Sequence, residues 1–128
     1  MALPAQTTDR DSYQVKPVRN VINIVATAAF SLGDYVASGP WHGVVLNSGV
    51  TGENMSVRIE EGYVVSTDTL ESGEDTFNTL GQQVFYKAST GTFSDTSTTG
   101  YRTVGWLSAV KSSDGVIEFE KTRYAGTV

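Results

Sequence analysis

One short phrase occurs twice in this chain, and each copy marks a corner that leads into an extended segment. Ser31-Leu32-Gly33-Asp34-Tyr35-Val36 and Thr79-Leu80-Gly81-Gln82-Gln83-Val84 both place a hydroxyl residue before Leu-Gly and end on valine. A glycine-led apolar run follows each copy downstream, beginning at Gly43 and at Gly105. Glycine lets the backbone turn sharply before a strand begins. The repeat therefore predicts a small β-barrel or β-sandwich with two related halves.

One of the differences between the two copies bears on their symmetry. Gln82 stands in the second copy where Asp34 stands in the first, so we do not expect the halves to be symmetric. We interpret the two phrases as equivalent entries into strands of one core, and the difference argues against a true duplication.

Short segments of alternating apolar and polar residues run through the rest of the chain, separated by turns rich in glycine, serine and asparagine. The Asp114-Gly115 pair lies between two such segments and predicts a hairpin. The pattern indicates an all-β fold, a small β-barrel or β-sandwich of about eight short strands with no helix. The expected strands are Asn20–Ala28, Tyr35–Ser38, His42–Leu46, Met55–Glu60, Tyr63–Thr67, Gln83–Ala88, Thr103–Lys111 and Val116–Lys121.

Three stretches lack a strand pattern, and we expect loops over Asp68–Leu80 and Ser89–Tyr101 and a short tail over Tyr124–Val128. Residues 1–19 are polar without a clear period, so we expect an extended N-terminal arm there and a single β domain over residues 20–128.

The arm carries the residues that we expect to contact another subunit or a further partner. Tyr13 and Val15 alternate with polar neighbours, which suits strand addition to another chain. The basic side chains of Arg10, Lys16 and Arg19 suit acidic loops on a partner.

Composition excludes several classes of protein. The 128 residues include no cysteine, which excludes disulfides and thiol chemistry. No apolar run approaches the roughly 18 residues needed to span a bilayer, and the first residues lack the basic start of a secretory signal. We therefore expect no membrane partner and synthesis in a cytoplasm. The net charge of −5 repels phosphate backbones, so we expect no nucleic-acid partner.

No set of residues has the spacing of a catalytic or metal site. His42 is the only histidine, and no motif marks a nucleophile and carboxylate for it, so we expect a structural residue. Glu60 and Glu61 point to opposite faces of a strand, while Glu118 and Glu120 share a face that alternation places in solvent. We expect no enzyme and no cofactor. Aromatic residues of small β domains are mostly core or interface anchors, and Trp41 is our candidate for an aromatic contact.

The ordered set of these motifs resembles the phage capsid decoration, or cement, proteins with a DUF2190-type β domain. The resemblance covers roughly residues 20–121 and excludes the arm. It rests on Gly33-Asp34-Tyr35-Val36, Gly43-Val44-Val45, Glu61-Gly62-Tyr63-Val64, Leu80-Gly81-Gln82-Gln83-Val84-Phe85-Tyr86-Lys87, Thr90-Gly91, Val104-Gly105-Trp106-Leu107 and Val116-Ile117-Glu118-Phe119.

The resemblance implies a structural virion protein. Such proteins bind the outer surface of the mature head, typically as trimers, and brace neighbouring capsomers. The implied partners are the major capsid protein and further copies of this chain, and the implied location is the capsid exterior. Two alternatives stay open: a virion-displayed module that binds carbohydrate or a host surface, and a tail structural protein.

Overall fold

A computed structural model describes residues 19–71 and 76–128, and this part of the chain is all-β with no helix. The predicted fold class is confirmed, with nine strands rather than about eight. Every pair of strands is antiparallel, and the sheet does not close into a barrel. The strands are β1 (Val21–Val25), β2 (Tyr35–Ser38), β3 (Trp41–Val45), β4 (Asn54–Arg58), β5 (Val64–Thr67), β6 (Gln83–Lys87), β7 (Thr92–Ser94), β8 (Arg102–Ala109) and β9 (Ile117–Thr127).

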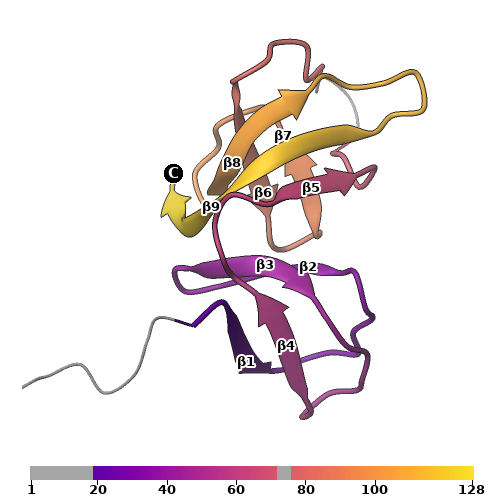
Figure 1. Ribbon diagram of the computed structural model, residues 1–128, viewed down its shortest axis with the longest axis vertical. Coiled ribbons are helices and arrows are strands. Elements are labelled where there is room, and N and C mark those ends of the chain that lie inside the picture. The colour runs from indigo at the N-terminus through magenta and orange to yellow at the C-terminus, as the bar shows by residue number, and fades with distance from the viewer. Residues whose placement is uncertain (1–18, 72–75) are drawn as a thin grey trace, which may run out of the picture.

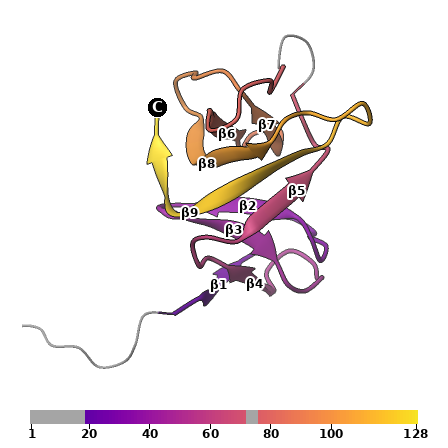
Figure 2. The ribbon, with the colours of Figure 1, turned by 45° about the horizontal axis from the view of Figure 1, so that its top comes forward.

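The strands form two halves that lie one above the other (Figure 1, Figure 2). The first half contains β1 to β4 in the order β2-β3-β4-β1, and the second contains β5 to β9 in the order β7-β6-β8-β9-β5. Only one register pair, Trp41 with Tyr124, joins β3 of the first half to β9 of the second. Each half also has its own cluster of buried apolar side chains.

The two Leu-Gly corners have the same hydrogen-bond geometry. In the first, the backbone N–H of Asp34 donates to the carbonyl of Ser31 at 3.1 Å, and the Asp34 carboxylate accepts from the Ser31 N–H at 2.9 Å. In the second, the Gln82 N–H donates to Thr79 O at 3.2 Å, and the Gln82 side-chain oxygen accepts from the Thr79 N–H at 2.8 Å. The asymmetry that we expected at Gln82 is therefore absent, because an amide oxygen and a carboxylate oxygen accept the same bond.

The pairing registers of the halves also coincide. Val36 pairs with Gly43 in the first half, as Val84 pairs with Gly105 in the second. The next strands match equally well, since Val44 pairs with Arg58 as Trp106 pairs with Glu120. Strands β1, β2, β3 and β4 of the first half therefore correspond to β5, β6, β8 and β9 of the second. The strand β7 has no counterpart among the described strands of the first half.

Two details of the sequence interpretation were wrong. The stretch Ser89–Tyr101, expected as a loop, contains β7, whose Phe93 is 2% exposed. The expected tail over Tyr124–Val128 is largely strand, because β9 continues to Thr127 and pairs with β8 at Arg102 and Thr103. The predicted hairpin at Asp114-Gly115 is confirmed as the connection between β8 and β9.

The paired glycines give a first prediction. A Cβ on Gly43 would overlap the carbonyl oxygen of Arg58, and a Cβ on Gly105 would overlap that of Glu120. Because neither backbone can move without breaking a sheet, Gly43→Ala and Gly105→Ala should each lower the free energy of unfolding by about 3 kcal/mol in urea denaturation. Gly126→Ala is the control, since its Cβ would lie 3.3 Å from Thr103 Cβ, and it should change stability by less than about 0.5 kcal/mol. Clearly unequal losses in Gly43→Ala and Gly105→Ala would contradict the equivalence of the halves, and an equally large loss in Gly126→Ala would contradict the carbonyl overlap as the cause.

Candidate functional site

His42 lies at the junction of the two halves, fully buried on β3. Its Nδ1 lies 2.5 Å from the hydroxyl of Tyr35, and its Nε2 lies 3.5 Å from Oγ1 of Thr122 on β9. Burial, and after it the nearby charge of Lys121, lower the pKa of His42 from 6.5 to about 3. Burial also raises the pKa of Tyr35 well above its ordinary value, so the hydroxyl stays protonated and donates to Nδ1. The imidazole is therefore neutral and sealed from solvent.

Lys121 crosses the same junction from the second half and is 2% exposed. Its Nζ donates to Ile59 O at 3.0 Å, at the end of the first half, and to Thr122 O at 2.7 Å. Burial, and after it the charge of Arg123, lower the pKa of Lys121 to about 8. Both bonds join the ammonium to backbone carbonyls, so its hydrogen bonds hold the two halves together.

Two tyrosine hydroxyls complete this junction. Tyr63 donates to Arg58 O at 2.7 Å and accepts from the Val44 N–H at 3.2 Å. Tyr86 of β6 donates to Tyr35 O at 2.7 Å. The titratable groups between the halves are thus engaged in structural hydrogen bonds.

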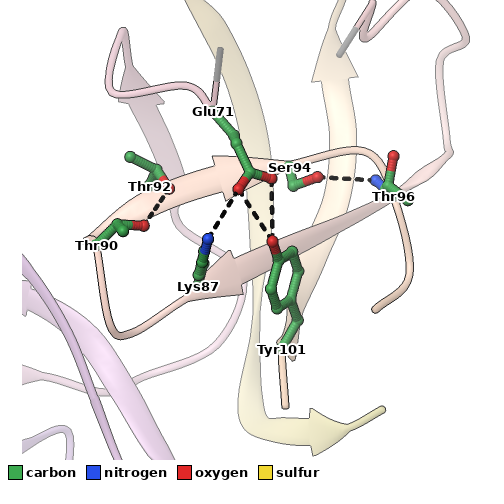
Figure 3. A network of polar contacts seen from close by, with 7 residues as sticks. All are labelled: Glu71, Lys87, Thr90, Thr92, Ser94, Thr96 and Tyr101. Atoms are coloured by element: carbon green, nitrogen blue, oxygen red, sulfur yellow. Dashed lines mark hydrogen bonds and ion pairs between the residues drawn. The ribbon is translucent and has the colours of Figure 1, made fainter. Parts of the chain in front are cut away.

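A second polar network lies in the second half, around β7 and the end of β6 (Figure 3). The Glu71 carboxylate accepts from Lys87 Nζ at 3.3 Å and from the Tyr101 hydroxyl at 3.0 Å. The hydrogen bond from Tyr101 lowers the pKa of Glu71, followed by the bond from Lys87. The lowered pKa keeps this carboxylate ionised. Its hydrogen bonds to Lys87 and Tyr101 join the segment after β5 to the end of β6 and to the residue before β8.

A third cluster, here called the arginine–aromatic cluster, consists of Trp41, Arg123 and Tyr124. The Trp41 and Tyr124 rings have centroids 5.3 Å apart and are tilted by 47°. The guanidinium carbon of Arg123 lies 5.9 Å from the Trp41 ring centroid and 5.8 Å from that of Tyr124. Tyr124 is 55% exposed. Cationic and aromatic groups at this spacing attract each other and form a shared, partly open surface.

The arginine–aromatic cluster adjoins the start of the folded body. Arg123 Nη2 donates to Arg19 O at 2.6 Å, immediately before β1. The Nε of Arg123 is shielded from solvent and has no hydrogen-bond partner within residues 19–71 and 76–128. Nearby Arg102 bonds to the carbonyls of Gly39 and Gly126. Neither Arg102 nor Arg123 has a carboxylate partner in the described part of the chain.

The structure brings together some of the predicted site residues. Trp41 and the backbone of Arg19 both contact Arg123. The other predicted arm residues, Arg10, Tyr13, Val15 and Lys16, lie outside the described residues. Sequence reasoning missed Arg123 and Tyr124, because only the pairing of β3 with β9 places them beside Trp41.

The described residues contain no group of three histidines, aspartates or glutamates that could hold a metal ion. They also contain no helix that is long and apolar enough to cross a membrane. Comparison of the chain with protein-family models, curated proteins and solved structures found no match.

The buried imidazole gives a prediction for acid stability. An unfolded chain protonates His42 below pH 6.5, whereas the folded chain does so only near pH 3. Stability is therefore lost as the pH falls through this interval. Relative to His42→Gln, the wild-type free energy of unfolding should fall by up to about 1.4 kcal/mol per pH unit between pH 6 and pH 4.

Urea denaturation across this pH range measures the difference between the two proteins. Tyr35→Phe is the control, since it removes a hydroxyl but keeps the histidine and its pH slope. Parallel wild-type and His42→Gln profiles would contradict the buried neutral imidazole.

Proposed function

We propose that this protein is a bacteriophage capsid decoration protein that binds the outside of the mature head as a homotrimer and braces neighbouring capsomers. The motifs that resemble cement proteins suggest this role. The observation that carries the proposal is the arginine–aromatic cluster at the base of the N-terminal arm. The β domain, through this cluster, and the adjoining N-terminal arm can then contact the shell at the same time.

The chemistry of the arginine–aromatic cluster suits protein recognition. Tyrosine, tryptophan and arginine are the residues that most often dominate binding energy at protein interfaces. Arg102 and Arg123 lack carboxylate partners in the described part of the chain, although the whole protein has a net charge of −5. An acidic loop on the capsid is therefore the partner that complements this surface, and Arg10, Lys16 and Arg19 extend the same charge along the arm.

Stabilisation of the head follows from mass action. Each bound copy stabilises the mature shell by RT ln(1 + [L]/Kd), and the effect multiplies over many sites. Selectivity for the mature shell requires a binding site that spans several subunits and is complete only after expansion. Ordering an arm costs roughly 1–2 kcal/mol per residue, so its contact with the capsid or a neighbouring subunit must exceed that cost.

The exposed tyrosine of the arginine–aromatic cluster tests the capsid contact. Tyr124→Ala should weaken binding to mature heads about tenfold, because a hot-spot side chain contributes more than 1 kcal/mol. Trp106→Ala is the control, since Trp106 is similarly exposed, at 48%, but lies outside this cluster. Co-sedimentation of each purified variant with undecorated heads measures the affinity. Wild-type protein that fails to bind heads would overturn the proposed function, and equal affinity of Tyr124→Ala would remove Tyr124 from the contact.

The arm has its own test. A chain lacking residues 1–17 should lose either head affinity or trimer formation, measured by co-sedimentation and by analytical ultracentrifugation. If this chain decorates heads with wild-type affinity and still forms trimers, the arm has no part in the mechanism.

A carbohydrate- or host-surface-binding module is the second candidate, favoured by the exposed aromatic rings of Tyr124 and Trp106. Aromatic faces stack on sugar rings, but the 47° tilt between Trp41 and Tyr124 does not form a flat platform. Glycan binding that is lost in Trp41→Ala or Trp106→Ala, without head binding, would support this candidate over the decoration protein.

A further inference from the structure

In the second half, β7 lies between β6 and the segment that follows β5. β7 pairs with β6 through Phe85, Tyr86 and Lys87. On its other side, Phe93 bridges to Leu70 in parallel, and its N–H donates to Thr69 O at 2.9 Å. β7 thus links β6 to the segment that continues β5.

The first half has no counterpart of β7 within the described residues. A groove, here called the β1–β2 groove, lies where that strand would be, with a volume of about 290 Å³. Its walls combine apolar side chains with the hydroxyl residues Thr27 and Ser38. It borders a larger groove of about 630 Å³ that reaches β5. The lining of the β1–β2 groove includes Ile24, Val25 and Thr27 on one side and Val36, Ala37 and Ser38 on the other.

The two positions correspond residue by residue. The shared registers make Ala37 and Ser38 the counterparts of Phe85 and Tyr86, the residues of β6 that pair with β7. They also make Thr27 the counterpart of Leu70, which bridges to Phe93. The β1–β2 groove is therefore an unfilled strand position.

The edge of β2 offers backbone groups to an added strand. β2 pairs with β3 alone among the described strands. The carbonyl of Tyr35 points away from β3, since it accepts the Tyr86 hydroxyl at 2.7 Å. Backbone groups alternate in direction along a strand, so the N–H and carbonyl of Ala37 point into the β1–β2 groove.

We infer that the β1–β2 groove binds the N-terminal arm of a second copy of this chain, with Ser12-Tyr13-Gln14 in the position that β7 occupies in the other half. This inference rests on the self-association that the proposed function includes. It assigns the arm a defined acceptor on the neighbouring copy.

The sequence of the arm matches that of β7. Thr92-Phe93-Ser94 places one aromatic residue between two small polar ones, and Ser12-Tyr13-Gln14 has the same polar–aromatic–polar pattern. Phe93 is buried against the rings of Tyr86 and Tyr35, at centroid distances of 5.0 and 5.1 Å. Tyr86 also lines the β1–β2 groove, so an aromatic side chain that enters there meets the same ring.

Chain length favours a second copy over the same chain. A strand in the direction of β7 runs parallel to the β1 side of the groove, and parallel neighbours require a connection of about a dozen residues or more. Only residues 15–20 lie between Gln14 and β1. A neighbouring copy is not subject to this limit, because the 18 residues before Arg19 span up to about 60 Å when extended.

The oligomeric state of the full chain tests this inference. Tyr13→Ser removes the aromatic side chain, and Thr27→Trp fills the β1–β2 groove at an exposed position. Both should raise the concentration at which the protein assembles at least about tenfold in sedimentation velocity. Tyr13→Phe and Thr127→Trp are the controls, since one keeps the ring and the other adds bulk outside the groove, and both should assemble as the wild type does. Circular dichroism checks that each variant is folded.

Assembly of Tyr13→Ser and Thr27→Trp at wild-type concentrations would overturn the inference, as would a wild-type chain that stays monomeric. A monomeric wild type whose head binding is lost in Thr27→Trp would assign the groove to the capsid protein instead. Because sedimentation uses the protein without heads, this inference can fail while head binding is retained, whereas failure of the wild type to bind heads counts against the proposed function.

Discussion

The junction between the two halves depends on the ammonium group of Lys121. It lies on β9 yet bonds to the carbonyl of Ile59 at the end of the first half, where burial lowers its pKa to about 8. A buried cation is tolerated only when its hydrogen bonds are satisfied, so the position of the first half relative to β9 is fixed closely. The neutral imidazole of His42 packs beside it. Hydrogen bonds from Lys121 to Ile59 O and between His42 and Thr122 join the halves.

Local sequence patterns predicted most of the strands because a half-buried strand alternates apolar and polar residues. They failed at β7, where Phe93 is the only large apolar residue among serines, threonines and glycines. They also failed at the end of β9, which passes from the core at Phe119 to the surface at Tyr124 and so loses its alternation. The arginine–aromatic cluster was only partly predictable, because Trp41 meets Tyr124 through a pairing between distant strands.

The repeated Leu-Gly corner is explained by the equivalence of the halves. Asp34 and Gln82 close equivalent turns with the same hydrogen bonds. Gly43 and Gly105 occupy equivalent positions, each closely approached by a backbone carbonyl, that of Arg58 or of Glu120. The halves share this frame and differ at one position, where the second half contains β7 and the first half contains the β1–β2 groove. One proposed binding surface lies on the first half at the edge of β2, and the other is the arginine–aromatic cluster, which contacts the backbone of Arg19.

Disulfide cross-linking between two chains tests the unfilled strand position most directly, because the natural sequence contains no cysteine. Chains carrying Tyr13→Cys are mixed with chains carrying Thr27→Cys and oxidised under mild conditions, with Thr127→Cys replacing Thr27→Cys as the control. The account predicts a heterodimer that joins Tyr13→Cys to Thr27→Cys and forms far faster than with the control, because a disulfide requires the two Cα atoms within about 7 Å. Equal rates in the two mixtures would contradict it.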